Sequence, residues 1–261
     1  FSGNNGVQIA LHFHDFFECS LLLSGKLSYQ IESVSFQEQP GDLLLISPNQ
    51  LHRPLFIHGT EPYKRIVFWL SRAFIERLSG EGCDLSACFY SGKAGAIRLG
   101  GAVRAQLVRL LSELLAASRS DAFGRDLLCR ALATNLLVHL NRIAQGDADA
   151  ISPAEIRISP LVQRVSDYLD AHLGEPVSLD ALSEAVYLSK YHLERRFREE
   201  TGASIYQMLL QKRMIRARNL MREGLPLLQV ALNCGFSGYS GFYKAFRSEY
   251  GVSPSEYLAQ M

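Results

Sequence analysis

Three histidines and one carboxylate near the start of the chain have the types and spacing of metal ligands. His12 and His14 are separated by one residue, Glu18 follows His14 by four residues, and His52 lies further downstream. Imidazole nitrogens together with a carboxylate oxygen form a ligand set that divalent transition metals accept. If residues 12–18 form one unbroken strand, its period of two places His12, His14 and Glu18 on one face. The alternative is that this polar cluster hydrogen-bonds an organic ligand or its own strands, and the sequence leaves both open.

The residues around this cluster predict a small all-β domain over residues 1–100. Turn-forming residues such as Gly25 and Pro40-Gly41-Asp42 separate short apolar runs. The runs that predict strands are Cys19–Leu23, Leu43–Ile46 and Ile66–Leu70. Several short strands with turns between them are typical of a small β-barrel or sandwich. The spacing of Gly6, His12, His14, Glu18 and Gly25, with His52 after a Pro-Gly-Asp turn, resembles the cupin fold. We therefore expect a cupin-like barrel that holds one small ligand near His12, His14, Glu18 and His52.

Two helices and a linker are expected next. Apolar residues recur at helical spacing from Gly101 to Ser118 and again from about Phe123 to Ile143, so residues 101–145 should form a helical pair. The apolar arc of the second helix is broad, which indicates that this helix is covered on more than one side. The turn-rich run that begins at Gln145, followed by Pro153, predicts an interdomain linker over residues 146–158.

The C-terminal region contains an internal repeat. Ser183 and Ser189 correspond to Ala231 and Ser237 at an offset of 48 residues, and the offset becomes 49 further along, at Phe197 and Phe246. In each copy a short amphipathic helix leads through a tight turn, with a Ser at or near the N-cap, into a second helix. This is the pattern of a helix-turn-helix. At the turn the second copy has Gly235, whereas the first has Tyr187, which must either avoid a positive φ or carry strain.

These residues resemble the AraC/XylS family of bacterial transcription regulators over about a hundred residues. The matching positions are Leu182, Leu188, Ser189, Leu193, Arg195, Phe197, Gly202, Tyr206, Arg213, Ala217, Leu220, Val230, Ala231, Gly235, Phe236, Phe242, Phe246, Gly251 to Pro254, and Tyr257. The sequence departs from the family pattern at Tyr187, at Gly241 inside the second recognition helix, and at Lys244. The resemblance implies an α+β protein whose residues 159–261 form an all-α DNA-binding domain of two helix-turn-helix units joined by a long helix. It also implies promoter DNA, a small-molecule effector and RNA polymerase as partners, and a homodimer interface on the helical pair.

The second helix of each unit carries the candidate DNA contacts. Between Lys190 and Arg222, nine Lys or Arg residues face three Glu residues, and this local excess of six positive charges favours phosphate contacts over a merely solvated face. In the first recognition helix Arg195 suits a guanine edge and Glu194 suits cytosine, while Lys190 and Arg198 suit phosphates. Leu193 and Phe197 should be core there, as should Phe242 and Phe246 in the second. The outward candidates are Lys190, Tyr191, Glu194, Arg195 and Arg198 in the first helix, and Tyr239, Ser240, Tyr243 and Lys244 in the second.

Composition limits the remaining possibilities. With 261 residues, 48% hydrophobic and 20% charged, the chain has the make-up of a two-domain globular protein. Its five cysteines are scattered, no apolar run approaches the ~20 residues of a membrane span, and no leader precedes the first domain, so we expect a bacterial cytoplasmic protein. The leading interpretation is a transcription regulator and not an enzyme. The alternatives are a cupin metalloenzyme with a DNA-binding tail, which would show bound metal and turnover, and a structural DNA binder, which the net charge of +1 does not favour.

Overall fold

The computed structural model describes residues 2–3, 9, 11–55, 63–91, 95–146, 151–153 and 155–259. The chain forms two compact units, which are treated separately below. Residues 1–9 and 13–157 make up unit 1, and residues 10–12 and 158–261 make up unit 2. Within the described residues, no helix combines the length and the apolar character needed to cross a membrane.

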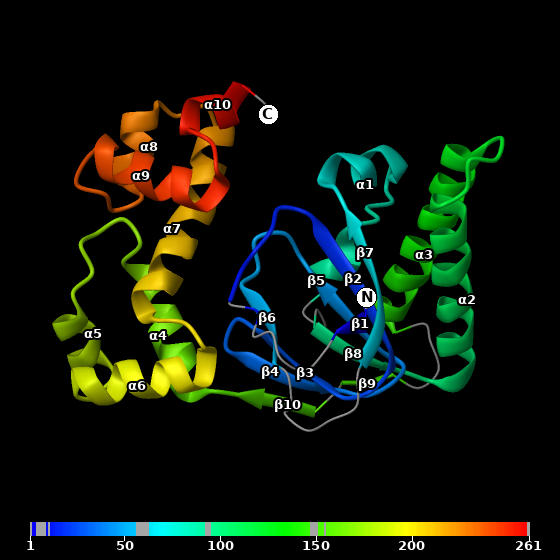
Figure 1. The fold of residues 1–261 in the computed structure, drawn as a ribbon, viewed down its shortest axis with the longest axis horizontal. Helices are drawn as coiled ribbons and strands as arrows, with labels where there is room; N and C mark the ends of the chain where they lie inside the picture. Colours follow the sequence, from blue (N-terminus) through cyan, green and yellow to red (C-terminus); the bar gives the residue numbers. More distant parts are fainter. Residues whose placement is uncertain are drawn as a thin grey trace. The chain divides into compact units, whose positions relative to one another are not determined.

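Unit 1 is built on two antiparallel sheets, as the alternating runs and turns of the sequence predict (Figure 1). The first sheet has the order β1-β7-β2-β5-β8-β9 and the second has the order β10-β4-β3-β6. The strands are β1 Ser2–Gly3, β2 Phe17–Ser24, β3 Leu27–Ile31, β4 Val34–Glu38, β5 Asp42–Ile46, β6 His52–Leu55, β7 Tyr63–Leu70, β8 Gly95–Leu99, β9 Ile151–Pro153 and β10 Glu155–Ile158. The three strands predicted from apolar runs are therefore confirmed as parts of β2, β5 and β7.

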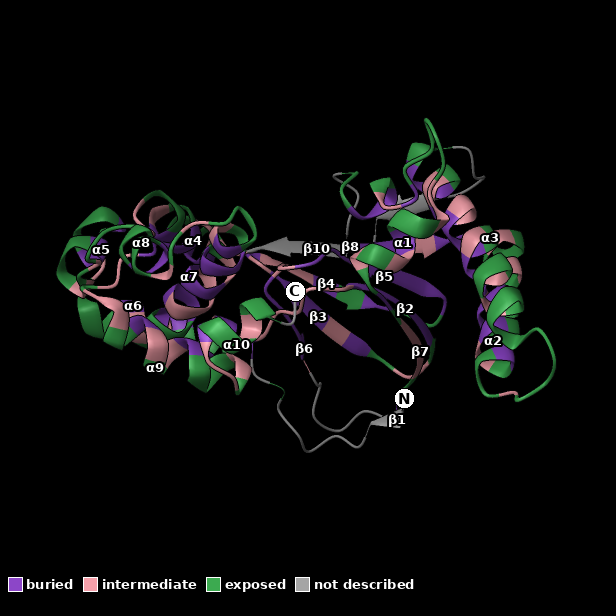
Figure 2. Cartoon of the chain, turned by 90° about the horizontal axis from the view of Figure 1, so that it is seen from above, coloured by how far each residue is buried: buried purple, intermediate pink, exposed green. Residues whose placement is uncertain are grey.

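The larger sheet separates two hydrophobic cores. Along β5, Leu43 and Leu45 pack with the helices of unit 1, whereas Leu44 and Ile46 pack with residues of the smaller sheet. A strand covered on both faces must be apolar at every position, which is why all of β5 is buried (Figure 2). The same alternation along β2 directs Cys19 toward the helices and Leu22 toward the space between the sheets.

The helices of unit 1 cover one face of the larger sheet. They are α1 Arg72–Leu78, the short 3₁₀ helix η1 Ala87–Phe89, α2 Gly101–Ser118 and α3 Arg125–Gln145. The expected helical pair is present, and its buried leucines join the core on the helix side of the sheet. At the start of α3, however, Phe123, Leu127 and Leu128 are exposed. One part of the broad apolar surface is thus not covered within the chain.

The expected linker over residues 146–158 is partly wrong. Two short strands lie in this range: β9, which pairs with β8 from Ile97↔Pro153 to Leu99↔Ile151, and β10, which lies beside β4. Residues 147–150 and 154 lie outside the described residues. The physical reason is backbone pairing, since β8 and β4 offer free edges that a short extended segment satisfies. The turn-rich residues from Gln145 onward concealed this.

Unit 2 is entirely helical apart from its first residues and contains the two predicted helix-turn-helix pairs (Figure 1). Its helices are α4 Pro160–Ala171, α5 Leu179–Ala185, α6 Lys190–Thr201, α7 Ile205–Arg222, α8 Leu227–Asn233, α9 Tyr239–Tyr250 and α10 Pro254–Ala259. Ser159, Ser178, Ser189 and Ser204 each cap the following helix by accepting a hydrogen bond from its first turn. Ser204 and Gln207 complete a capping box at the start of α7.

The two turns have the same left-handed backbone conformation although their residues differ. Tyr187 and Gly235 occupy equivalent positions, and both adopt a positive φ, of 56° and 76° respectively. The turn in the first copy therefore carries a left-handed residue with a side chain, which costs ~1–2 kcal/mol of conformational energy. In the second copy Ser237 lies next to the N-cap of α9, which is Gly238, and no side-chain hydrogen bond caps this helix.

Candidate functional sites

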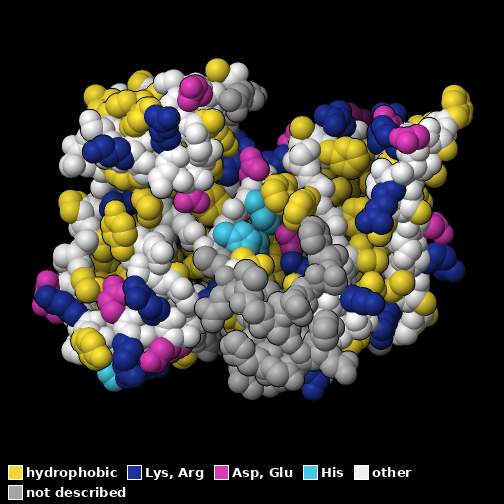
Figure 3. Space-filling view, viewed as in Figure 1, with side chains coloured by type: hydrophobic (Ala, Val, Ile, Leu, Met, Phe, Trp, Pro, Cys, Tyr) yellow, Lys and Arg dark blue, Asp and Glu magenta, His cyan; other side chains and the backbone are white. Residues whose placement is uncertain are grey.

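The first recognition helix, α6, has a buried side and an exposed side. Leu193 and Phe197 are completely buried, as predicted. Tyr191 is 78% exposed, Arg195 is also exposed, and Glu194 is half-buried. Figure 3 shows basic and acidic side chains lying close together over α6, at the lower left of the view. Tyr191 and Arg195 thus project away from the core of unit 2, as a base-reading surface requires.

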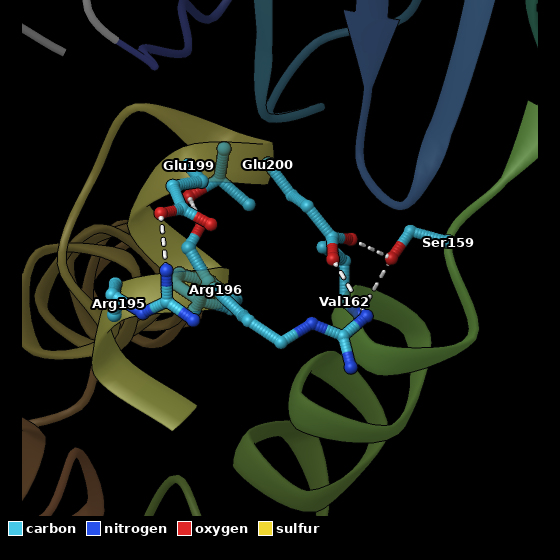
Figure 4. Close-up of polar contacts among 8 residues, drawn as sticks. Ser159, Val162, Arg195, Arg196, Glu199 and Glu200 are labelled. Carbon is cyan, nitrogen blue, oxygen red and sulfur yellow. Dashed lines mark hydrogen bonds and ion pairs between the residues drawn. The ribbon is translucent and has the colours of Figure 1, made fainter. Parts of the chain in front are cut away.

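The charged side chains of α6 are held by ion pairs of two kinds. On the exposed side, Nη1 of Arg195 lies 3.2 Å from Oε1 of Glu199, one helical turn along (Figure 4). Lys190 pairs with Asp180 of α5, the preceding helix. All four side chains are about half exposed or more, so these pairs are worth little and can exchange for phosphate or base contacts.

Arg196 has a different role. Its guanidinium donates to Glu200 at 3.1 Å, Glu200 accepts from the hydroxyl of Ser159, and Ser159 caps α4 by accepting from the N–H of Val162 (Figure 4). This chain of hydrogen bonds joins α6 to the first turn of α4. Arg196 therefore positions the recognition helix.

The basic run is less exposed than its sequence indicated. Arg213 and Arg218 are 9% and 2% exposed, respectively. Nε of Arg213 donates to the carbonyl of Leu173 at 3.2 Å and Nη2 donates to the carbonyl of Glu175 at 2.6 Å, and burial lowers the pKa of this arginine. The Arg218 guanidinium lies against the aromatic ring of Tyr250. These two arginines stabilise the fold of unit 2. They are therefore not available as phosphate contacts, although the sequence counted them in the basic run.

The second recognition helix, α9, is more aromatic. Phe242 and Phe246 are completely buried, as predicted, and Ser240, Gly241 and Lys244 are exposed, while Tyr239 and Tyr243 are half-buried. A Cβ added to Gly241 would meet only the Phe236 ring, at 3.8 Å, so packing does not require a glycine there. Arg247 was not among the predicted contacts; it is exposed and donates to the hydroxyl of Tyr243 at 3.4 Å. Its spacing of three from Lys244 was the available signal.

In unit 1, a polar cluster lies in the space between the two sheets. Glu18 lies on the same face of β2 as Leu22, which packs between the sheets. His52 on β6 pairs with Ile31, which also belongs to the core between the sheets. His14 precedes β2, and its ring lies edge-on to that of His52, with centroids 4.6 Å apart. One potential ligand atom from each of His14, Glu18 and His52 lies within 4.8 Å of the others. The structure thus brings together three of the four side chains expected here.

His12 is not a member of this group, and the reason is local. The sequence analysis assumed one strand through residues 12–18, but β2 begins only at Phe17. Asp15 and Phe16 form a bend, so the period-two argument does not apply from His12 to Glu18. His12 belongs to unit 2, whereas His14, Glu18 and His52 belong to unit 1.

Neighbouring side chains orient the cluster. The indole N–H of Trp69 donates to Oε2 of Glu18 at 2.9 Å, and the guanidinium of Arg65 lies 3.7 Å from Oε1. Burial raises the pKa of Glu18, but hydrogen bonding with His14 and the positive charge of Arg65 outweigh burial and give a net lowering. Glu18 is therefore an anion inside the unit.

Glu38 in β4 behaves in the opposite way. It is 3% exposed, and within the described residues neither carboxyl oxygen has a hydrogen-bond partner. Burial raises the pKa of Glu38 to about 8, although the charge of Arg65 opposes the shift. At neutral pH this carboxyl group is therefore mostly protonated and does not share the role of Glu18.

A cavity of about 550 Å³ that was not predicted lies on the helix side of the larger sheet. Phe17, Ile75 and Tyr90 form its apolar walls and Arg72 is its basic side chain. No motif marks this cavity, because its lining comes from β2, α1 and the segment around η1. It is separate from the His14–Glu18–His52 cluster, which faces the other side of the sheet.

Comparisons with known proteins agree with this two-part arrangement. The AraC-like ligand binding domain matches residues 2–137, and a helix-turn-helix domain matches residues 182–260. The chain is 25% identical over 248 residues to the transcriptional activator RhaR of Pectobacterium carotovorum subsp. carotovorum (strain PC1), covering 95% of this chain and 85% of RhaR. It is 26% identical over 228 residues to the arabinose operon regulatory protein of Salmonella typhimurium (strain LT2), covering 85% and 75%.

Among solved structures, the DNA-binding domain of the global transcriptional factor AdpA in complex with a target DNA is 31% identical to this chain. That match covers 39% of this chain and 92% of the AdpA domain, with a TM-score of 0.37. The ligand-binding domain match alone spans more than half of the chain. This protein therefore belongs to the AraC family of transcription regulators, with a ligand-binding domain followed by a helix-turn-helix DNA-binding domain.

Proposed function

We propose that this regulator binds an asymmetric promoter site by placing α6 and α9 in successive major grooves on one face of the DNA. The observation that carries the proposal is that each of the two helices has a buried and an exposed side. Leu193 and Phe197 are buried in α6, Phe242 and Phe246 are buried in α9, and polar side chains lie on the other side of each helix. The connecting helix α7 has 18 residues, or about 27 Å. This length is of the order of one DNA turn, ~34 Å.

The side chains of α6 divide into base readers and phosphate contacts. We propose that Arg195 reads a guanine edge and Glu194 a cytosine, with Tyr191 beside them, because these side chains lie away from Leu193. Lys190, in the first turn, and Arg198 suit phosphates. In α9 the proposed contacts are Tyr239, Ser240, Tyr243 and Lys244, with Arg247 added from the structure.

Genomic DNA fragments selected by the full chain, followed by guanine methylation interference, would test this arrangement. We expect two groups of interfering guanines separated by roughly 10 base pairs, one for each recognition helix. Removing the side chains of α9 with Tyr243→Ala and Lys244→Ala should erase one group only. A single group of interfering guanines in the unaltered protein would contradict the two-groove proposal.

We propose that unit 1 binds a small polar effector beside His14, Glu18 and His52. The support is an anionic carboxylate, two imidazoles and Arg65 meeting in the space between the two sheets. A panel of sugars and small metabolites should contain a compound that raises the melting temperature of the protein. That increase should be absent in Glu18→Gln. A broad panel without effect would remove the support for this site.

We further propose that α3 forms a homodimer interface. Phe123, Leu127 and Leu128 are at least half exposed at its N-terminal end, and contiguous apolar surface of this kind marks interaction sites. Leu127→Glu with Leu128→Glu should yield monomers in sedimentation velocity. The matched control Leu228→Glu, at an exposed leucine of unit 2, should not change the oligomeric state. If neither variant changes it, α3 is not the interface.

The wider role follows from DNA binding. We propose that the protein acts in the bacterial cytoplasm by binding and not by catalysis, and that RNA polymerase is the partner through which it alters transcription. The support is that the related proteins are transcription regulators. Transcription from a selected promoter with purified RNA polymerase, with and without the protein, would show whether it activates or represses.

A further inference from the structure

We propose that His14, Glu18 and His52 bind one divalent transition-metal ion, such as Zn²⁺, between the two sheets of unit 1. The proposal rests on the proposed effector site, which it makes more specific: the ion would take two imidazole nitrogens and one carboxylate oxygen from the protein. A set of two histidines and one glutamate leaves a coordination position open. An oxygen atom of the effector could occupy that position.

The histidine tautomers are the first support. Nδ1 of His14 lies 2.9 Å from the carbonyl oxygen of Phe16, and Nδ1 of His52 lies 2.8 Å from the carbonyl oxygen of Gln50. A carbonyl only accepts, so each Nδ1 must carry the hydrogen, and a neutral ring then has its lone pair on Nε2. Metal-binding histidines are typically fixed through a hydrogen bond from the other ring nitrogen. Two separate backbone segments impose the same arrangement here.

The distances are the second support. Two ligands bound at ~2.1 Å to a tetrahedral ion lie about 3.4 Å apart, and no two ligands of one ion can be more than ~4.2 Å apart. Nε2 of His14 and Oε2 of Glu18 are 3.4 Å apart, and the whole set lies within 4.8 Å. To reach the tetrahedral separation the widest pair needs to close by up to about 1.4 Å, so binding requires rotation of these side chains.

The third support is the contact between His14 and Glu18. Nδ1–H of His14 donates to a backbone carbonyl, so Nε2 of the ring faces a carboxylate oxygen of Glu18 3.4 Å away. A metal ion bound to both groups would take one donor atom from each, and His52 adds a third donor atom.

Two neighbours define what the site would accept. The Trp69 indole donates to Oε2 of Glu18, which fixes the carboxylate. The Arg65 guanidinium, 3.7 Å from Oε1, shares the negative charge of Glu18 with the ion. Arg65 should weaken metal affinity relative to a site without it and attract an anionic oxygen of the effector. The class of ligand we expect is therefore a carboxylate or polyhydroxy compound that coordinates the ion.

The chain contains its own reporter for this experiment. Trp69 is the single tryptophan, and it is hydrogen-bonded to a proposed ligand. Untagged full-length protein, stripped with a chelator, would be titrated with Zn²⁺ by calorimetry and with Co²⁺ by tryptophan fluorescence. We expect one ion per chain in both titrations and quenching of Trp69 by Co²⁺.

Three variants test the assignment of ligands. Glu18→Gln keeps the shape of the side chain, His14→Ala alters a residue that precedes the strand, and each should weaken Zn²⁺ at least tenfold. His52→Ala should do the same, but because His52 is completely buried, the first two variants are decisive if it fails to fold. The matched control is His12→Ala, which should keep affinity within about twofold. Circular dichroism of each variant checks the fold.

The outcomes separate this inference from the proposed function. No stoichiometric ion, or an ion whose affinity is unchanged by Glu18→Gln and His14→Ala, overturns the metal site. Loss of affinity in His12→Ala overturns the three-residue assignment. A metabolite that stabilises metal-free protein, with Glu18→Gln removing the effect, would support the effector site while overturning the metal. DNA binding is measured independently and decides neither result.

Discussion

Gly235 occupies a position where a single methyl group should be expensive for unit 2. Its φ of 76° lies in the left-handed region. A Cβ built there would lie 2.5 Å from Nη2 of Arg213 and 2.6 Å from the carbonyl oxygen of Leu173. Neither obstacle is free to move, because Arg213 is buried and donates to the carbonyls of Leu173 and Glu175. Gly235→Ala must therefore strain the backbone and also break part of this hydrogen-bond arrangement.

The cost can be divided into two parts with a matched control. Gly251 has a φ of 74°, and nothing lies within 4 Å of the Cβ that alanine would add. Gly251→Ala should therefore report the conformational part alone, about 1 kcal/mol once the lower entropy of unfolded alanine is subtracted. Gly235→Ala adds the loss of about one charged hydrogen bond, ~1.5–3 kcal/mol. We expect the two variants to differ by about 2 kcal/mol.

Urea unfolding of the full chain would measure this difference. Far-UV circular dichroism follows the helices of both units, while fluorescence of Trp69, the single tryptophan, reports unit 1 alone, so unit 2 is followed by the part of the helical signal that does not change together with Trp69. The helical transition should move to lower urea in Gly235→Ala, and the Trp69 transition should stay in place. If Gly235→Ala and Gly251→Ala agree within about 0.5 kcal/mol, the argument that Arg213 and Leu173 exclude a side chain is refuted.

Three further predictions follow from exposed and buried charges and from the first turn. Arg195→Ala should cost ~1–3 kcal/mol of binding free energy on the selected DNA site and remove the preference at one base position. Lys190→Ala should weaken binding to matched and scrambled DNA equally and reduce the slope of log K against log salt concentration by roughly 0.9. If Arg195→Ala weakens binding to both DNAs equally, its ion pair with Glu199 is its main role. Burial raises the pKa of Glu38 to about 8, so the folded state keeps a proton that the unfolded state releases, and stability falls as the pH rises from the usual range of a glutamate toward 8. Glu38→Gln should remove up to about 4 kcal/mol of this loss of unfolding free energy between pH 5 and pH 8. The measurement is unfolding followed by Trp69 fluorescence with a chelator present. An unchanged pH profile would show that Glu38 is ionised. Tyr187→Gly should raise the melting temperature of the helical transition, because the backbone strain that it removes, ~1–2 kcal/mol, exceeds the entropic cost of a glycine, ~0.5–1 kcal/mol. A lower melting temperature would show that the exposed ring makes stabilising contacts.

The helix-turn-helix pairs were predictable because their signals are local. Helix caps and buried pairs depend on residues three or four apart, as at Ser189, at Ser204 and at Leu193 with Phe197. Because the unit is repeated, much of this pattern occurs twice in the sequence. Sheet pairing is not local. The strand partner of β9 and the bend before β2 depend on residues far away in the chain. For that reason the linker was predicted wrongly in part, and His12 was wrongly expected beside His14 and Glu18.

Charge is the other limit of sequence reasoning. Arg195 and Arg213 have the same side chain and lie in the same basic run, yet one is exposed and the other is inside unit 2. What separates them is a pair of carbonyl groups just beyond the end of α4, those of Leu173 and Glu175, which accept hydrogen bonds from Arg213. A buried arginine needs such acceptors, and no pattern in its own helix shows that they are present.

The two recognition helices are consequently held by interactions of different strength. The Arg196–Glu200–Ser159 chain that joins α6 to α4 is partly exposed, and exposed ion pairs contribute at most ~1 kcal/mol. The turn before α9 is fixed by Gly235 against the buried Arg213, an arrangement worth several times more. Both helices are also anchored by two fully buried side chains, so this difference lies in the polar contacts alone. The polar contact that joins α6 to the first turn of α4 is therefore the weaker one, and the contact that fixes the turn before α9 is the stronger one.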